Sequence, residues 1–306
     1  MKAGPDVATT TAVKTIALTK RYGRDEALSG VDLQVPREAV YVLVGANGAG
    51  KSTLFQILMN MVRADSGVAT VFGMDSAVQG PEVRAHIGYV PEYHVLPYRQ
   101  SSGRQLIDHV SQYYPTWDHA YAARLVAALE LCTQKRIAAL SKGEARRLQL
   151  LLALAHRPPV LLLDEPTDGL DPVIRNRSLT LLAEHLADAP TTLLMSTHHI
   201  HEVERLADHV GILRSGRLIA QLSRDVLRRT VKRYRIEVPA EWEASAMLRA
   251  IDIQRSSDRR EVRVKIVAEE EVAVERLIQS GAEVREVSAL SLEDATLAIL
   301  AAETGR

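Results

Sequence analysis

Residues 45 to 53 read Gly-Ala-Asn-Gly-Ala-Gly-Lys-Ser-Thr, a match to the pattern GxxxxGK[ST]. The match follows the apolar run Val40 to Val44 and precedes apolar residues at helical spacing, so it predicts a loop between a strand and a helix. At such a helix start, free backbone N–H groups and the positive end of the helix dipole together attract phosphates. We therefore expect this loop to bind a nucleoside triphosphate.

Each residue type in the loop suits this chemistry. Glycines let the backbone pass close to the phosphates, and Lys51 adds a cation. The Ser52 hydroxyl is placed to ligate the Mg²⁺ ion that accompanies ATP. We expect the nucleotide contacts from Gly48, Ala49, Gly50, Lys51, Ser52 and Thr53.

Two acidic residues follow a second apolar run, 113 positions after Lys51. Val160 to Leu163 is bounded by Pro158-Pro159 and by Asp164, which is typical of a buried parallel strand with functional residues at its carboxyl end. Asp164 can hold the water shell of Mg²⁺, and Glu165 can orient and deprotonate a water molecule for attack on the γ-phosphate. The two motifs together predict an ATPase site.

The composition limits the classes of partner. The 306 residues contain 38 Lys and Arg and 38 Asp and Glu, so the net charge gives no reason to expect nucleic-acid binding. The single cysteine, Cys132, cannot form an internal disulfide, and we find no secretory leader, so we expect a cytoplasmic protein. No apolar run approaches the ~20 residues that cross a bilayer. A membrane role would therefore come through a partner or a surface contact.

Periodicity predicts an α/β domain with a helical insertion. Short strands near the N-terminus are separated by turn residues, whereas the region from Pro97 to Leu152 has helical spacing. The expected strands and apolar segments are Val13–Leu18, Gly30–Val35, Val40–Val44, Val68–Phe72, His86–Val90, Val160–Leu163 and Thr192–Met195. The expected helices are Lys51–Met61, Val110–Tyr114, Ala120–Leu131 and Glu144–Ala155. Residues 1–11 are expected to be a mobile leader.

A second, smaller domain is expected after a boundary near residue 226. The order of elements there becomes βαββαβ, which suggests an α+β ferredoxin-like sandwich with one added helix. Ser291 and Asp294 fit a capping box for that last helix. The segments are strand Tyr234–Val238, helix Trp242–Ile251, strands Ile251–Gln254 and Glu261–Val267, helix Glu270–Ile278, strand Glu283–Val287 and a helix from Leu292.

A basic run leads into this second domain. A run of this kind is typical of a solvated linker, which we favour, and it could also bind anionic lipid headgroups. Its members are Arg224, Arg228, Arg229, Lys232, Arg233 and Arg235.

The segment Leu140-Ser141-Lys142-Gly143-Glu144, taken with Asp164 to Asp171 and Ser196-Thr197-His198, resembles the ATP-binding cassette (ABC) family. The resemblance covers roughly residues 13 to 222. It implies a P-loop NTPase (RecA-like) core with an antiparallel β subdomain and a helical subdomain at about 95–155. On this basis the ATP-binding domain spans 12–225, and 226–306 form the accessory domain.

The resemblance also implies a head-to-tail pair of cassettes with ATP at the seam. Ser141 and Gly143 match the signature residues that contact the γ-phosphate bound to the opposite protomer, and Lys142 and Glu144 lie in the same segment. Asp171 matches the loop that crosses the dimer seam. A single copy would then hold only half of each site.

Further positions carry over one at a time. Tyr22 matches the aromatic residue that stacks on adenine, and Asn47 matches a polar residue of the phosphate loop that faces the partner. Glu92 lies in the segment that links the core to the helical subdomain and touches the transmembrane partner. His198 matches the switch histidine at the γ-phosphate.

Three positions depart from the family pattern. Glu92 stands where the family has glutamine; with Ser52 and Asp164 it can still serve as a metal ligand, but its charge near phosphates predicts a strong Mg²⁺ dependence. Lys142 replaces a glycine and Glu144 a glutamine. Lys142 is compatible with a nearby phosphate. Hydrolysis is still expected, because the catalytic candidates Lys51, Glu165 and His198 are retained.

The resemblance implies the ATPase subunit of a membrane transporter. Such a subunit pairs with a second copy or a paralogous cassette and lies at the inner face of the cell membrane through separate transmembrane subunits. The ending Ser291-Leu-Glu-Asp is similar to the exporter-type (ABC-2-like) branch, which indicates export.

Two alternatives remain open: a non-transport ABC ATPase and a nucleotide-gated regulatory module. The single phosphate loop disfavours a fused translation factor. Only 90 positions separate Lys51 from Ser141, with no heptad run, which disfavours a repair ATPase. A GTPase is disfavoured because no guanine-reading [NT]KxD motif is found.

Overall fold

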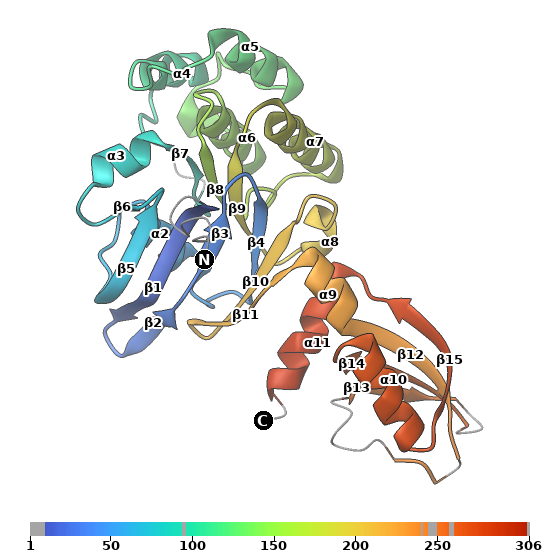
Figure 1. Cartoon of the computed structure of the whole chain (residues 1–306). Helices are drawn as coiled ribbons and strands as arrows, with labels where there is room; N and C mark the ends of the chain where they lie inside the picture. Colours follow the sequence, from blue (N-terminus) through green and yellow to red (C-terminus); the bar gives the residue numbers. More distant parts are fainter. Residues whose placement is uncertain (1–9, 94–95, 240, 244–249, 257–259, 305–306) are drawn as a thin grey trace, which may run out of the picture. The chain divides into compact units, whose positions relative to one another are not determined.

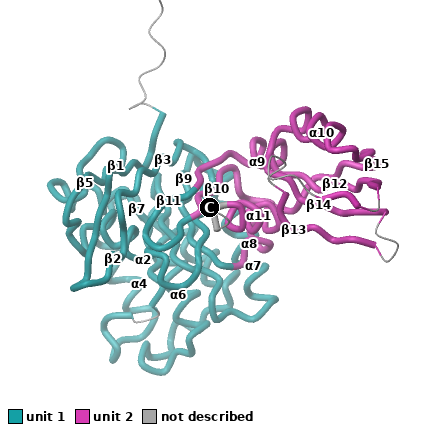
Figure 2. The backbone as a smooth tube through the Cα atoms, turned by 90° about the horizontal axis from the view of Figure 1, so that it is seen from below, with its two compact units in different colours: residues 1–198, 213–219 teal, residues 199–212, 220–306 magenta. Residues whose placement is uncertain are grey.

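The computed structural model describes residues 10–93, 96–239, 241–243, 250–256 and 260–304. The chain divides into two compact units (Figure 2). The first contains Met1–His198 and Leu213–Ile219, and the second contains His199–Ile212 and Ala220–Arg306. Each unit has its own cluster of buried apolar side chains.

The phosphate loop belongs to a six-stranded sheet with the order β11-β10-β4-β9-β8-β7. Four neighbouring strands run parallel and place their carboxyl ends at one edge, with Val44 beside Thr197 and Asp164 beside Ser196. They are almost wholly buried, which explains their continuous apolar sequence. The predicted parallel strands are confirmed. The strands are β4 (Val40–Val44), β7 (Ile87–Val90), β8 (Val160–Asp164), β9 (Thr192–Thr197), β10 (His209–Arg214) and β11 (Arg217–Ser223).

A five-stranded antiparallel sheet forms the second layer of the first unit. The single strand predicted at Gly30–Val35 is wrong, because β2 ends at Val31 and β3 begins at Gln34. Thr15 explains the break: its hydroxyl donates to the Val31 carbonyl at 2.8 Å and accepts from the Leu33 amide at 3.0 Å. The strands are β1 (Thr11–Tyr22), β2 (Asp25–Val31), β3 (Gln34–Pro36), β5 (Ser66–Val71) and β6 (Met74–Asp75).

The N-terminal leader falls mostly outside the described residues. Thr11, which the leader was expected to include, is the first residue of β1 and pairs with Pro36 of β3. The leader prediction is therefore wrong at this position. Residues 1–9 lie outside the described part of the chain.

The helices of the first unit include the expected helical insertion, shown at the top of Figure 1. The helix predicted at Val110–Tyr114 is misplaced: it runs from Gly103 to Ser111 and starts at a capping box of Ser102 and Gln105. The helices are α2 (Lys51–Leu58), α3 (Gly80–Ala85), α4 (Gly103–Ser111), α5 (His119–Ala128), the short 3₁₀ helix η1 (Ile137–Ala139), α6 (Lys142–Leu154) and α7 (Pro172–Asp188).

The second unit is built on a four-stranded antiparallel sheet with the order β13-β14-β12-β15. Numbered along the chain this is 2-3-1-4, the order of the predicted ferredoxin-like sandwich. The helix predicted at Trp242–Ile251 lies largely outside the described residues, and its last residue, Ile251, is in a strand. The elements are α8 (Ile200–Val203), α9 (Arg224–Thr230), β12 (Val231–Glu237), β13 (Ala250–Arg255), β14 (Glu261–Val267), α10 (Glu270–Gln279), β15 (Glu283–Ala289) and α11 (Leu292–Thr304).

The last helix begins where the sequence predicts. The Ser291 hydroxyl accepts from the Asp294 amide at 3.1 Å, which is one half of a capping box. The Asp294 carboxylate instead accepts from Lys265 at 3.0 Å and so ties α11 to β14. In the part of the chain that is described, we find no helix with the length and apolar character needed to span a bilayer.

Candidate functional site

The phosphate loop joins β4 to α2 and lines a pocket of about 370 Å³. Gly50 has φ 106, and a Cβ built there would come within 2.3 Å of the Ala27 carbonyl oxygen, so the loop tolerates no side chain at this point. The pocket lining includes Tyr22, Asn47 and all the loop residues from Gly48 to Thr53 that we expected to bind the nucleotide, but neither Asp164 nor His198. The lining residues are Tyr22, Ala27, Asn47, Gly48, Ala49, Gly50, Lys51, Ser52, Thr53, Glu92, Tyr93 and Glu165.

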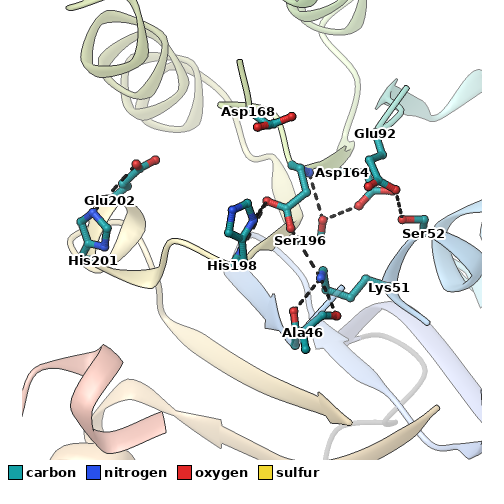
Figure 3. Close-up of polar contacts among 12 residues, drawn as sticks. Ala46, Lys51, Ser52, Glu92, Asp164, Asp168, Ser196, His198, His201 and Glu202 are labelled. Atoms are coloured by element: carbon teal, nitrogen blue, oxygen red, sulfur yellow. Dashed lines mark hydrogen bonds and ion pairs between the residues drawn. The ribbon is translucent and has the colours of Figure 1, made fainter. Parts of the chain in front are cut away.

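Lys51 is a buried cation held by the loop and by an acid (Figure 3). Its ammonium donates to the Gly45 carbonyl at 2.7 Å and to the Ala46 carbonyl at 3.3 Å. It also lies 3.5 Å from Glu165 Oε1. Lys51 thus lies between the phosphate loop and Glu165, the proposed catalytic acid. Its positive charge suits a site that binds phosphates.

Asp164 ends β8 with its carboxylate buried, at 1% exposure. Its Oδ1 accepts from the Ser196 hydroxyl at 2.5 Å, and its Oδ2 makes no hydrogen bond with any described residue. Burial is the main reason that the pKa of Asp164 is raised. A buried, under-satisfied carboxylate is stabilised by a cation.

Ser52 and Glu92 complete an oxygen-rich corner of the pocket. The Ser52 hydroxyl donates to Glu92 Oε2 at 2.8 Å. Hydroxyl and carboxylate oxygens are the donors that Mg²⁺ prefers. Together with the under-satisfied Oδ2 of Asp164, this donor set fits a magnesium ion.

Glu165 is oriented by the end of β9. The residue has φ 48, an uncommon left-handed conformation that its amide supports by donating to the Ser196 hydroxyl at 3.0 Å. His198 Nδ1 lies 2.9 Å from Glu165 Oε2, at hydrogen-bond distance (Figure 3). Lys51 therefore contacts one oxygen of the Glu165 carboxylate, and His198 contacts the other.

The signature segment caps α6. The Ser141 hydroxyl accepts from the Glu144 amide at 3.2 Å, and Glu144 Oε2 accepts from the Ser141 amide at 2.7 Å. Lys135 also donates to Glu144, and this hydrogen bond is the main reason that the pKa of Glu144 falls to about 2. The departure at Glu144 thus has a structural role, as the second half of a capping box.

The other signature residues contact the loop after β8. Lys142 Nζ lies 2.8 Å from Asp168 Oδ2, and a Cβ on Gly143 would come within 3.2 Å of the Gly169 carbonyl oxygen. Asp171 caps α7 by accepting from the Val173 and Ile174 amides, each at 3.1 Å.

The candidate residues fall into two groups. Those of the first group line the pocket or contact a residue that lines it. The second group consists of the signature segment 141–144 and Asp171, none of which is among the described residues that line the pocket. Tyr22 lines the pocket with nearly half of its surface exposed, which leaves a face for a base.

Sequence reasoning missed Arg146, which links α6 to the segment around Glu92. Arg146 is 1% exposed, and its guanidinium donates to the carbonyls of Pro91 and Glu92, the latter at 2.6 Å. Gln149, one turn further on, donates to the Tyr93 carbonyl at 3.0 Å. An arginine on the buried face of an amphipathic helix was the available signal.

Ser196 was quoted in a motif but given no role. It is buried near the carboxyl end of β9 and contacts Asp164, the last residue of β8, and the following residue: its hydroxyl donates to Asp164 and accepts from the Glu165 amide. A serine directly after the apolar run of a predicted parallel strand was the signal for this contact.

Comparisons with known proteins place this site among nucleotide-binding cassettes. The sequence model described as "ABC transporter" matches residues 28–168, and a model described as "AAA domain, putative AbiEii toxin, Type IV TA system" matches residues 136–204. The chain is similar to the ABC transporter ATP-binding protein YtrB of Bacillus subtilis (strain 168), with 32% identity over 211 residues, which cover 69% of this chain and 72% of that protein.

Two further similarities extend the comparison. The daunorubicin/doxorubicin resistance ATP-binding protein DrrA of Streptomyces peucetius is 34% identical over 262 residues, covering 81% of this chain and 79% of that protein. A solved ATP-binding subunit of an ABC transporter has a TM-score of 0.65 at 28% identity, over 72% of this chain and 92% of that one. A dimeric cassette bound to ADP and Pi, at 21% identity and a TM-score of 0.61 over 69% and 98% of the two chains, shares the fold.

Proposed function

The chain belongs to the ABC transporter family of ATP-binding proteins, and we propose that two copies close head-to-tail around two Mg²⁺–ATP to drive transport. It is an ATPase subunit that works with membrane partners. The observation that carries the proposal is the convergence of Lys51, Glu165 and His198 at the edge where the phosphate loop and β8 meet.

The pocket residues support a division of labour. Lys51 and the loop amides bind the β- and γ-phosphates, and Tyr22 receives the adenine. Glu165 orients and deprotonates the attacking water, while His198 holds that carboxylate and contacts the γ-phosphate. Ser52, Asp164 and Glu92 would hold a magnesium ion, and the ion would neutralise charge on the phosphate oxygens.

The signature segment supports the dimer. Ser141 and Gly143 lie at the N-terminus of α6, a terminus that attracts phosphate, yet they do not line the pocket of their own chain among the residues described. In the proposed dimer they close over the ATP of the second copy, with Asn47 and Asp171 at the seam.

The relatives support a place at the membrane and a direction. Proteins similar to this chain carry names that denote drug resistance, bacitracin transport and Nod factor export. We infer that this chain acts in an exporter of the ABC-2-like branch, peripheral at the inner face of the cell membrane through its transmembrane subunits.

Phosphate release from ATP and Mg²⁺ by the purified chain tests the catalytic assignment. Replacement of Glu165 by glutamine should lower the rate at least about 100-fold, because the general base is lost. The matched control is Glu286→Gln, an exposed glutamate of the second unit, which should keep the full rate. Equal rates in Glu165→Gln and the unaltered chain would remove the role given to Glu165.

Size-exclusion chromatography tests the dimer. The Glu165→Gln variant should elute as a dimer with saturating ATP and as a monomer without it, because hydrolysis no longer reopens the pair. A monomer at saturating ATP would contradict the two-copy site. Mass spectrometry of membrane proteins that co-purify with the chain would then identify the transport subunits.

A further inference from the structure

The sheet of the second unit has one apolar face and one charged face. Side chains alternate between the faces of a strand. Tyr234, Ile236 and Val264 are buried in an apolar cluster that includes residues of α10. The alternate positions of β12 and β14 carry four cations on the opposite face, namely Arg233, Arg235, Arg263 and Lys265.

Like charges stand directly opposite one another on this charged face. β12 and β14 pair with Arg233 opposite Lys265 and Arg235 opposite Arg263. Opposed like charges destabilise a sheet. Without anionic partners, these four cations would therefore destabilise the sheet.

Carboxylates offset part of this charge. Asp294, at the start of α11, lies 3.0 Å from Lys265 and 3.5 Å from Arg233. Asp252 lies 3.2 Å from Lys265 on the other side. Arg235 pairs with Glu286 and Glu261 at 3.1 and 3.7 Å.

Arg263 is the exception. It is exposed, and it makes no ion pair with any residue that the structure describes. Its guanidinium therefore retains its donors for a ligand.

A hollow of about 150 Å³ lies on the charged face. Asp252 reaches it because β13 has a register irregularity there, with φ 58 at Asp252. Three cations, one amide and one carboxylate are among the residues that line the hollow, so its lining is positive overall. The lining residues are Arg233, Asp252, Gln254, Arg263, Val264 and Lys265.

We propose that this hollow binds a phosphate group, presented either by free phosphate or by the headgroup of an anionic lipid. A guanidinium offers a planar fork of donors that matches two phosphate oxygens, which assigns Arg263 as the principal contact. Lys265 supplies a point charge held by two carboxylates, and Gln254 supplies a neutral amide donor. Asp252 and Asp294 repel an anion on their own side, so they orient it toward Arg263.

Equilibrium dialysis of the full chain with radiolabelled inorganic phosphate tests the hollow. The phosphate loop can also bind phosphate, so the titration is repeated in Lys51→Ala, which removes the cation of that loop. The hollow is altered by Arg263→Gln. Arg205→Gln is the matched control, because Arg205 is exposed in the same unit, lies outside the basic run and does not line the hollow.

The expected result is a phosphate site that persists in Lys51→Ala and in Arg205→Gln and is weakened at least about 10-fold in Arg263→Gln. A site that disappears in Lys51→Ala and is unchanged in Arg263→Gln would overturn the proposal and locate the phosphate at the phosphate loop. Circular dichroism checks that Arg263→Gln is folded. Because Arg263 lies opposite Arg235 and makes no ion pair with a described residue, its replacement should not lower the unfolding midpoint below that of Arg205→Gln.

Sedimentation with vesicles of phosphatidylglycerol and phosphatidylcholine distinguishes the two sources. If a lipid headgroup is the source, vesicle binding falls in Arg263→Gln, is kept in Arg205→Gln and is competed by inorganic phosphate. If free phosphate is the source, dialysis shows the site and the vesicles do not bind. Equal loss of vesicle binding in both variants, with no phosphate site by dialysis, would indicate diffuse surface charge and overturn the proposal.

Discussion

The catalytic edge of the first unit and the charged face of the second unit both gather ionisable side chains on a β-sheet, in opposite ways. At the catalytic edge, acids lie at the end of a buried parallel strand, where Asp164 is the last residue of β8 and the next residue, Glu165, lines the pocket. On the charged face, cations are spread along antiparallel strands, as Arg233 and Arg235 are. Strand ends concentrate groups at a point, whereas strand faces distribute them in rows.

Burial changes what these charges can do. Asp164 is buried with one oxygen lacking a hydrogen bond among the described residues, and its pKa is raised by burial. Arg235 is exposed and has two acidic partners. A buried charge that lacks a hydrogen-bond partner is stabilised when a ligand binds it. An exposed ion pair contributes at most about 1 kcal/mol to the stability of the fold. Of the two arrangements, only the first is therefore suited to chemistry.

The largest expected effect comes from removing one lysine from each unit. Lys51→Ala should lower ATP hydrolysis by about 10³-fold and weaken ATP binding, because a buried cation that faces the phosphates is lost. Lys232→Ala breaks the pair with Glu270 in the second unit and should leave ATP hydrolysis unchanged. Steady-state phosphate release and titration with a fluorescent ATP analogue measure both. A comparable loss of ATP hydrolysis in Lys232→Ala would show that a lysine of the second unit matters to the reaction as much as Lys51 does.

Acid should destabilise the first unit through two buried histidines. Burial is the main reason that the pKa values of His156 and His185 fall to about 4, from 6.5. Tyr114 stacks on His156, and Tyr121, Arg157 and Asp188 surround His185. The unfolded chain therefore binds more protons between pH 6.5 and 4, so stability is complete above pH 6.5 and declines as pH falls. The loss is about 2 kcal/mol per histidine at pH 5.

Urea unfolding at pH 7 and pH 5 measures this loss of stability. It can be followed by fluorescence in each unit separately, because each unit has its own buried tryptophan. With Trp242 replaced by phenylalanine, Trp117 reports on the first unit, and the reverse variant reports on the second. No histidine occurs in the apolar cluster of the second unit as far as it is described, so that unit should lose less. His156→Gln should reduce the pH 7 to pH 5 difference by about 2 kcal/mol, whereas exposed His119→Gln should not.

The link between α6 and the segment around Glu92 should control the magnesium dependence. Arg146→Gln removes the donors to the Pro91 and Glu92 carbonyls. We expect about a 10-fold rise in the Mg²⁺ concentration for half-maximal hydrolysis, because Glu92 is no longer positioned beside Ser52. Arg147→Gln is the control, since Arg147 donates to the Leu129 carbonyl at the end of α5 instead. Purely structural damage would lower the rate at every Mg²⁺ concentration without moving the midpoint.

The smallest expected effect distinguishes a serine that only caps a helix from a serine that also belongs to the signature segment. Ser141 caps α6 and Ser291 caps α11, so alanine at either position should cost about 1 kcal/mol of stability. Only Ser141→Ala should also slow ATP hydrolysis, because Ser141 is proposed to contact the phosphate of the second copy. Denaturant unfolding and phosphate release, measured on both variants, test this. Full activity in Ser141→Ala would leave that residue as a cap alone.

Local signals in the sequence are enough to predict the elements of the catalytic edge. The phosphate loop, the apolar strand bounded by Asp164 and the helix predicted from Glu144 each depend on a short stretch of chain, and all three elements are confirmed, although the helix starts two residues earlier, at Lys142. The predictions fail where another signal competes. The Ser102–Gln105 capping box starts α4 well before Val110, and Thr15, distant in sequence, sets the break after Val31.

The candidate catalytic and binding residues can be identified from the sequence. The conformational freedom of glycine, the helix dipole and the burial of a strand each act over a few residues, so they leave a local pattern. Which of them meet depends on the tertiary structure. Ser196 bridges Asp164 and Glu165, Arg146 holds the carbonyl of Glu92, and Arg263 is left without an ion pair in the described part of the second unit. These contacts join residues on different strands and helices. Their distances depend on packing, which no local pattern encodes.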